Sequence, residues 1–451
     1  MSRHSSPGSS LVLHPRDIQG VFERDLRISW AAFGLSAAVV ASLLARPVAA
    51  DVPKAPDLSL QRTTDERENP NTAPPAAPQR GATGEWGGVR SRLEDKGLTF
   101  AGTLLVDGSH VLRGGIDTER TFVRYYLDLN ATLDMEKAAG WKGATAFFDF
   151  ASHHGADGSA KGAGDFISFD NIEDPRYVQV AQLWFQQVID EKVRMKVGKI
   201  DALVDFSAME HATYFLSSAA LYAPAMFPMP TGAHDAAGGE LFLEQKDGPY
   251  VGGGAFYDNR HNRVMVLEGH PEDGSMADGG TFLIGEAGLH YRFLELQGHA
   301  AVGGWYHSGG FGRINDAGSS ARGAYGVYAF IDQTLWEEAE VAGHAAREIG
   351  GFLQAGWTDA RDSAVDGSFT GGLSAKGFVP GRADDVVGAL AAYVHLPQKT
   401  LREEREMAFE LFYHCQLLPF VALKPDFQYI VSPTGTYPDA AVVTLRLQID
   451  F

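Results

Sequence analysis

The last ten residues constrain the fold more than any other part of the chain. In residues 444–451 the two faces differ, with Thr444, Arg446, Gln448 and Asp450 on one and Leu445, Leu447, Ile449 and Phe451 on the other. Strict alternation is typical of a β-strand whose faces meet different environments. Soluble sheets alternate too, but a final strand that ends on an aromatic residue is typical of bacterial outer-membrane barrels. The prediction of a barrel therefore depends on whether this alternation recurs along the rest of the chain.

The pattern recurs in sixteen candidate strands between residue 98 and the C-terminus. They begin near Leu98, Thr121, Ala144, Arg176, Val193, Gly239, Pro249, Thr281, Leu296, Arg322, Arg347, Ser368, Val387, Glu406, Phe420 and Ala440. Helical patterns of about 10–15 residues do not alternate with these strands, which argues against a parallel βαβ architecture.

The connections between the candidate strands fall into two classes. Those after even-numbered strands are short, at 190–192, 246–248, 292–295 and 416–419, although 336–346 and 376–386 are longer. Those after odd-numbered strands are long, at 154–175, 201–238, 258–280 and 308–321. Short turns on one rim and long loops on the other are typical of an outer-membrane barrel.

The two faces of these strands also differ in charge. Arg124 and Asp128 share a face of one strand, and Arg194 and Lys196 share a face of another, while the opposite faces carry almost no charge. In a barrel of this size the charged face lines a lumen and the apolar face meets lipid. We therefore predict an all-β fold, a 16-stranded antiparallel transmembrane β-barrel with a short periplasmic N-terminal helix and an inward-folded long loop.

The first 97 residues predict three segments before the barrel. Residues 1–50 fit a signal peptide, because Arg24 and Arg27 precede the uncharged stretch 28–44 and small residues precede Asp51; an inner-membrane anchor is the alternative. Residues 51–83 form a Pro-rich disordered tether. Residues 84–97 predict a short periplasmic helix that packs through Val89 and Leu93, and residues 98–451 form the barrel.

Composition excludes several kinds of protein. The formal net charge of −19, without a basic cluster, argues against nucleic acid as a partner. Cys415 is the single cysteine, so an intrachain disulfide is excluded.

His153 and His154 are adjacent and point to opposite faces of a strand, so we expect no metal site. Neither Gly-x-Ser-x-Gly nor a phosphate-binding glycine loop occurs, and we expect no cofactor and no enzymatic activity.

Three stretches of the chain form recognisable motifs: Gly-Glu-Trp-Gly-Gly-Val-Arg at 84–90, Lys-Val-Gly-Lys-Ile-Asp at 196–201, and Pro-Asp-Phe-Gln-Tyr-Ile at 425–430. In this order they resemble the carbohydrate-selective porin (OprB) family. The resemblance covers about residues 84–451 and implies a barrel in the outer membrane of a Gram-negative bacterium. It further implies passive, binding-assisted diffusion of sugars, with monosaccharides such as glucose expected, through a pore that inward-folded loops make narrower. The long N-terminal region departs from the family pattern and leaves the sugar open.

A sugar-selective pore needs polar side chains that replace water around hydroxyl groups and flat surfaces for pyranose rings. The candidates are residues expected to face the lumen or the loop 201–238, which we expect to form the constriction. They are Arg124, Asp128, Asp149, Gln182, Trp184, Gln186, Arg194, Lys196, Asp201, Asp205, Glu410, Asp426 and Gln428.

Several alternatives stay open at this point. The basic residues Arg124, Arg194 and Lys196 also fit a general or anion-preferring porin, and a barrel enzyme or a structural role for the tether are further alternatives. The loop 201–238 could instead contact a neighbouring subunit. Besides sugars, the expected partners are outer-membrane lipid, lipopolysaccharide and a homotrimer.

Overall fold

The computed structural model describes residues 81–258, 265–269, 279–312, 320–338, 346–359, 363–399 and 401–451. The expected signal peptide and almost all of the expected tether therefore lie outside the described residues. Among the residues that are described, no helix combines the length and apolar character needed to cross a membrane.

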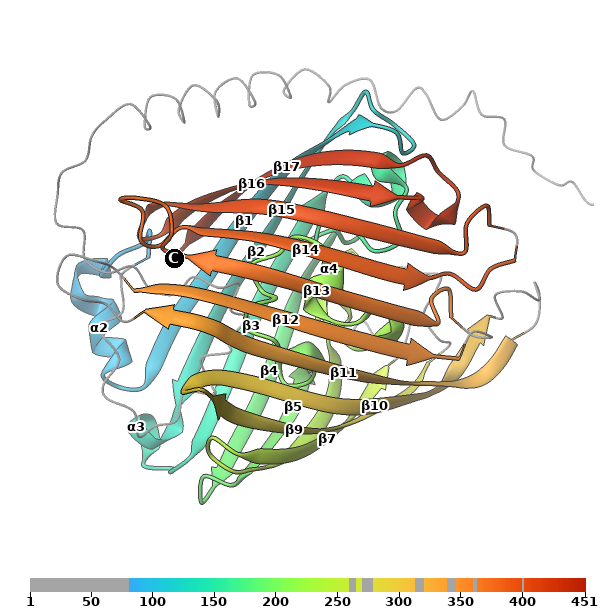
Figure 1. The fold of residues 1–451 in the computed structure, drawn as a ribbon. Coiled ribbons are helices and arrows are strands. Elements are labelled where there is room, and N and C mark those ends of the chain that lie inside the picture. The colour runs from blue at the N-terminus through green and yellow to red at the C-terminus, as the bar shows by residue number, and fades with distance from the viewer. Residues whose placement is uncertain are drawn as a thin grey trace, which may run out of the picture. The chain divides into compact units, whose positions relative to one another are not determined.

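Sixteen long strands form one closed antiparallel barrel (Figure 1). They are β1 (Leu98–Arg113), β2 (Thr121–Asp134), β3 (Ala144–Gly155), β4 (Tyr177–Ile189), β5 (Val193–Ile200), β6 (Ala236–Glu244), β7 (Pro249–Asp258), β9 (Gly280–Phe293), β10 (Leu296–Gly312), β11 (Ser320–Glu338), β12 (Arg347–Thr358), β13 (Gly367–Lys376), β14 (Val386–His395), β15 (Arg405–Leu418), β16 (Val421–Val431) and β17 (Ala440–Asp450). Each pairs with its neighbours, and β1 pairs with both β2 and β17, which closes the barrel. The predicted barrel is confirmed, and every predicted strand begins within 3 residues of the observed start.

The short strand β8 (Val266–Gly269) was not predicted from the sequence. It lies in the connection between β7 and β9 and pairs with the first residues of β4, where Tyr177 faces Gly269. The partner of β4 along the rest of its length is β5, which ends at Ile200 where the chain leaves the wall. A four-residue strand carries too little alternation to be recognised in a sequence.

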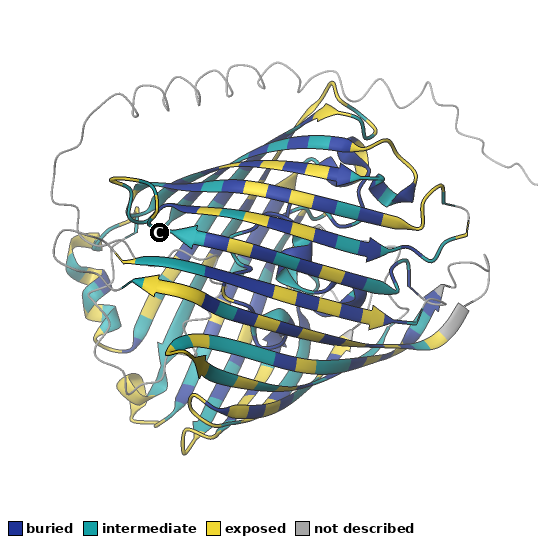
Figure 2. Ribbon diagram, viewed as in Figure 1, coloured by how far each residue is buried: buried dark blue, intermediate teal, exposed yellow. Residues whose placement is uncertain are grey.

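The faces of the barrel follow the predicted alternation (Figure 2). On β16, Lys424, Asp426 and Gln428 are buried inside, whereas Phe427 and Tyr429 are exposed outside. The outward face consists mainly of apolar side chains, and the inward face holds most of the charge. Each long strand is hydrogen-bonded to a neighbour on both edges, as a membrane-spanning barrel requires.

The two rims differ as predicted. Connections at the rim that holds the C-terminus are mostly short, as at 190–192, 245–248 and 294–295, and that rim also carries α2 (Val89–Glu94) and α3 (Met135–Ala139) (Figure 1). The longest connections of the other rim are 156–176 and 201–235. We call these the β3–β4 loop and the β5–β6 loop.

Short helices occupy the loops and the chain before β1. The β3–β4 loop holds η3 (Ser159–Ala163), and the β5–β6 loop holds η4 (Ala202–Val204), α4 (Ser218–Leu221), η5 (Pro224–Met226) and η6 (Gly232–His234). The others are η2 (Trp86–Gly88), directly before α2, and η7 (Pro433–Gly435), between β16 and β17.

The N-terminal helix packs differently from the prediction. Val89 is 40% exposed, and the buried residue of α2 is Arg90. Its guanidinium donates to the carbonyl oxygen of Phe100 at 2.7 Å and to that of Phe451 at 3.3 Å. The helix is therefore fastened to the seam between β1 and β17 by a buried charge, because backbone oxygens at the strand ends accept hydrogen bonds from Arg90 there.

Candidate functional site

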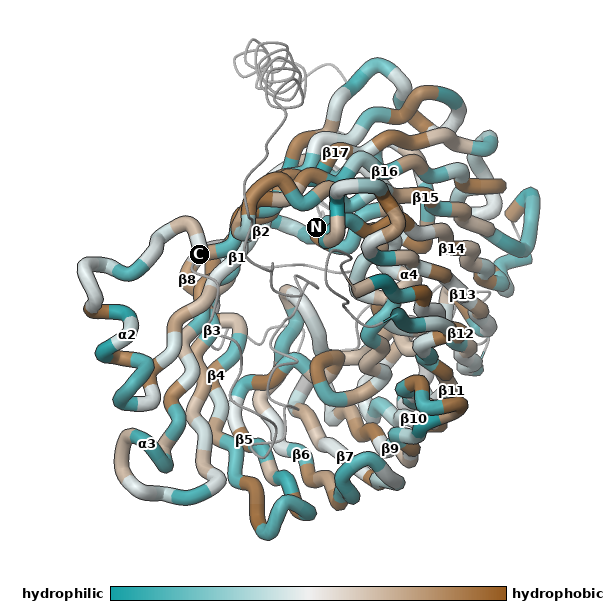
Figure 3. The backbone as a smooth tube through the Cα atoms, turned by 60° about the vertical axis from the view of Figure 1, so that its left-hand side comes forward, coloured by the Kyte–Doolittle hydropathy of each residue, from teal (hydrophilic) through white to brown (hydrophobic). Residues whose placement is uncertain are grey.

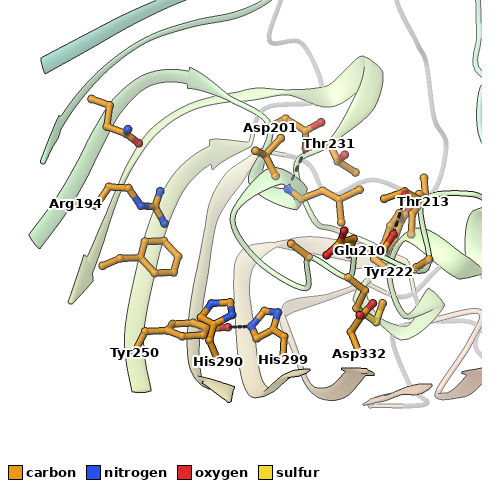
Figure 4. Close-up of a pocket in the computed structure, with 18 of the residues that line it drawn as sticks. Arg194, Asp201, Glu210, Thr213, Tyr222, Thr231, Tyr250, His290, His299 and Asp332 are labelled. Atoms are coloured by element: carbon orange, nitrogen blue, oxygen red, sulfur yellow. Dashed lines mark hydrogen bonds between the residues drawn. The ribbon is translucent and has the colours of Figure 1, made fainter. Parts of the chain in front are cut away.

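A cavity of about 2030 Å³ occupies the lumen between the short-turn rim and the two long loops. Its wall comes from residues of β1 to β7 and β9 to β11, and its inner end comes from the β3–β4 and β5–β6 loops. Figure 4 shows Arg194, Tyr250, His290 and His299 on one side of this space and Asp201, Glu210 and Tyr222 of the β5–β6 loop on another.

The β5–β6 loop lies inside the barrel, as predicted. Phe206, Phe215, Leu216 and Met226 are fully buried, and Figure 3 shows α4 within the ring of strands. An apolar loop of this kind cannot remain in water, and the lumen wall offers it matching apolar surface at Phe352 and Phe412. The loop therefore narrows the lumen.

The start of the β5–β6 loop is held by cations of the wall. Asp205 accepts hydrogen bonds from Arg194 at 2.5 Å and from Lys196 at 2.6 Å. Glu240 on β6 lies 3.7 Å from Arg194 and 3.4 Å from Lys196, and Glu244 lies 2.8 Å from Arg194. Both predicted basic residues are thus surrounded by carboxylates.

His211 fastens the next part of the loop to β11 and β12. Its Nδ1 lies 2.5 Å from Asp332, its Nε2 lies 3.3 Å from Glu348, and its backbone N–H donates to Asp332 at 2.9 Å. Burial alone lowers the pKa of His211, but the hydrogen bonds to the two carboxylates outweigh burial and raise the pKa to about 10. Gly350 provides the room, because a Cβ there would lie 1.8 Å from the imidazole ring.

The middle of the loop is held by β12, β15 and β16. Glu410 accepts the backbone N–H groups of Leu216 at 2.7 Å and Ser217 at 2.9 Å. Gln354 donates to the carbonyl oxygens of Ala219 and Ala220, and Lys424 donates to that of Tyr214 at 2.6 Å. The loop therefore crosses the lumen from β5 to β15.

The β3–β4 loop is held by a buried ion network. Arg124 on β2 pairs with Asp170 and, at 2.7 Å, with Glu173. Arg446 on β17 pairs with Asp107 at 2.7 Å and with Asp170 at 3.0 Å. Burial acts to raise the pKa of Asp170, but the two guanidinium groups outweigh it and hold that pKa below its usual range. For Glu173 the effect of burial exceeds that of the Arg124 charge and raises the pKa to about 8.

The two loops also contact each other inside the barrel. Ser218 N–H donates to the carbonyl oxygen of Ser168 at 3.0 Å, and the Asn171 side chain donates to that of Phe215 at 3.1 Å. Gln428 on β16 donates to the carbonyl oxygen of Phe169 at 2.6 Å. The loops therefore act as one structural unit across the lumen.

All thirteen predicted site residues are buried inside the barrel, but they divide into two groups. Those that line the cavity are Gln186, Arg194 and Asp201. Those that hold a loop or a neighbouring wall residue instead are Arg124, Asp128, Asp149, Gln182, Trp184, Lys196, Asp205, Glu410, Asp426 and Gln428. Trp184, a candidate flat surface for a pyranose ring, instead stacks on Phe147 with ring centroids 4.9 Å apart.

The structure adds residues that sequence reasoning missed. Tyr250, His290, His299 and Asp332 line the cavity, and Glu286 accepts the Ser207 N–H of the loop at 2.8 Å. Each lies on the inward face of its strand, so the alternation around it was the available signal. Among the described residues, no group of three or more His, Cys, Asp or Glu side chains is placed to hold a metal ion.

A closed 16-stranded barrel with a polar lumen and two inward loops defines a porin, a channel protein that carries out no catalysis. Residues 123–451 match the family model described as carbohydrate-selective porin, OprB family. The chain belongs to the OprB family of carbohydrate-selective porins and is a Gram-negative outer-membrane protein.

Relatives and solved structures agree with this assignment. The chain is 23% identical to the putative porin QuiX of Acinetobacter baylyi over 82% of this chain and 92% of the relative. It is 23% identical to Porin B of Pseudomonas aeruginosa over 82% of this chain and 90% of the relative. The high-pH structure of Pseudomonas putida OprB superposes with a TM-score of 0.72 at 20% identity, and covers 83% of this chain and 99% of that one.

Proposed function

We propose that this porin passes neutral monosaccharides such as glucose by diffusion, with transient binding in the lumen. The observation that carries the proposal is the cavity of about 2030 Å³, closed on its inner side by the two loops and lined by polar side chains. A site of this size and polarity can hold a hydrated sugar and exchange its water shell for protein hydrogen bonds. The β5–β6 loop sets both the width of the pore and the residues the sugar meets.

The charge distribution favours neutral solutes over anions. Arg124, Arg194 and Lys196, which left an anion-preferring porin open, are each paired with carboxylates. Among the described residues, the cavity is lined by 11 Asp or Glu residues against 4 Lys or Arg residues. If Glu173 is counted as neutral and His211 as cationic, because the pKa of each is raised, the cavity still has 10 acidic side chains against 5 cationic ones. The field of such a wall repels anions that approach from the short-turn rim.

The N-terminal segments and the assembly complete the proposal. Cleavage of residues 1–50 would leave a mature chain that starts at Asp51, and N-terminal sequencing of the outer-membrane protein tests this. Outer-membrane lipid and lipopolysaccharide would surround the apolar outer face. Assembly into a homotrimer stays a prediction, which light scattering of the detergent complex can test.

The direct test is conductance in a planar bilayer, titrated with mono- and disaccharides. Channels whose current falls as sugar is added support the proposal, since a bound sugar displaces ions from the lumen. Channels that conduct ions equally with and without sugar would mean a general porin. Failure of the refolded barrel to conduct at all would contradict transport.

A further inference from the structure

Four ring-bearing side chains form a continuous row across the short-turn half of the lumen. They come from the adjacent strands β6, β7, β9 and β10 and are Phe242, Tyr250, His290 and His299. Ring centroids lie 6.3 Å apart for Phe242 and Tyr250, 5.4 Å for Tyr250 and His290, and 4.1 Å for His290 and His299. All four line the cavity, and we call this row the ring ledge.

Glycines on neighbouring strands allow the rings to lie along the wall. A Cβ at Gly252 would meet the Phe242 ring at 2.1 Å, and a Cβ at Gly288 would meet the Tyr250 ring at 2.3 Å. Each ring therefore covers the inner side of a glycine, and a side chain at either glycine would displace the ring from the wall. The lumen stays open beside the ledge because the rings rest on the wall.

Hydrogen bonds fix the ledge and connect it to the β5–β6 loop. The Tyr250 hydroxyl donates to Glu286 at 2.6 Å and lies 2.8 Å from Nε2 of His299. The other oxygen of Glu286 accepts from Ser207 of the loop and from Tyr328, each at 2.8 Å. The Arg194 guanidinium stacks 4.3 Å from the centre of the Phe242 ring. The ledge is thus preorganised rather than formed on binding.

The chemistry of the ledge matches a pyranose. Phe242 is 1% exposed and Tyr250 8%, whereas both imidazoles are half-buried, so a solute meets mainly His290 and His299. The two imidazoles stack on each other, so the faces between them are closed to a solute, and their contribution is ring nitrogens that donate or accept hydrogen bonds, as the hydroxyls of a pyranose require. Arg292 and Gln297, both exposed to the cavity, add donors beside them.

We propose that the ring ledge is a sugar-binding subsite for neutral pyranoses on the periplasmic side of the loop constriction. The inference rests on the proposed function and adds a second binding position to it. A sugar that has passed the loops contacts the ledge before it leaves at the short-turn rim. Sugar that enters from the periplasmic side reaches the ledge first.

The test compares the full-length protein with the double variant His290→Leu/His299→Leu in a planar bilayer of known orientation. The variant removes both imidazoles and keeps Glu286, the carboxylate through which the ledge meets the β5–β6 loop. We expect the affinity of block by glucose added on the periplasmic side, measured against each channel's own sugar-free current, to fall about tenfold, as loss of one or two polar contacts predicts. Tyr291→Leu, an outward-facing neighbour, is the matched control and is expected to behave as wild type.

If glucose blocked the correctly folded double variant as well as it blocks wild type, the proposal that the ring ledge binds sugar would be overturned, while the porin function would remain. A wild-type channel that no sugar blocks would instead remove the proposed function itself. If the double variant does not fold, Gln297→Cys supplies the test in an otherwise intact ledge. A thiol reagent added from the periplasmic side should modify it several-fold more slowly in saturating glucose, and an unchanged rate would refute the subsite.

Discussion

Removal of the Glu410 carboxylate should release the middle of the β5–β6 loop from the wall. Its two oxygens accept the N–H groups of Leu216 and Ser217 at 2.7 and 2.9 Å, and all three residues are buried. A hydrogen bond to a charged group contributes about 1.5–3 kcal/mol, so Glu410→Ala should destabilise the docked loop by about 3–6 kcal/mol. Glu410→Gln keeps one acceptor and should cost about half as much.

The assay is single-channel recording of both variants with and without sugar. A loop that leaves β15 widens the lumen, so we expect Glu410→Ala to raise conductance, to add current noise and to weaken sugar block, with Glu410→Gln intermediate. Glu403→Gln, at an exposed glutamate before β15, is the control for the loss of one negative charge. Wild-type conductance and noise in Glu410→Ala, in a folded barrel, would refute the reasoning that this carboxylate holds the loop.

Four further predictions concern other contacts, the charge of the cavity and the lipid face. Since the pKa of His211 is raised from 6.5 to about 10, its ion pairs are fully present below pH 6.5 and weaken as pH rises towards 10. Conductance should therefore rise more steeply over that interval in wild type than in His211→Leu, in which Glu173 of the cavity still titrates. Reversal potentials in a KCl gradient should show preference for potassium over chloride, and a chloride preference would contradict the acidic cavity. Arg446→Leu leaves the buried carboxylates of Asp107 and Asp170 without this guanidinium. We expect it to lower the free energy of unfolding by about 3–5 kcal/mol in a refolding titration. Leu447→Arg places a charge on the lipid face and should lower the free energy of unfolding by about 2–4 kcal/mol. Equal stability of wild type and both variants would mean that the inward and outward faces are wrongly assigned.

The barrel could be predicted from the sequence because its signals are local. Alternation within each strand identifies the face that turns inward, and the lengths of the connections identify the rims. Arg124, Arg194 and Glu410 could be placed inside the barrel on this basis. The four-residue β8 escaped prediction because so short a segment shows no periodicity.

The roles of the inward residues could not be predicted, because they depend on where the loops run. Alternation places Arg446 on the lumen side, where a wet environment would make it expendable. The structure instead buries Arg446 between Asp107 of β1 and Asp170 of the β3–β4 loop. Trp184 similarly meets Phe147 rather than the cavity. A loop path is a long-range property, and no pattern within one strand reports which loop residue will cover it.

The central claim, that the β5–β6 loop sets both pore width and sugar binding, is tested most directly by deletion of residues 213–229. This segment contains α4 and η5 and the backbone groups that Glu410 and Gln354 hold. The deletion leaves the strands intact, so the barrel should fold. We predict that single-channel conductance rises and sugar block weakens together. A folded deletion variant with unchanged conductance and unchanged sugar block would contradict the account.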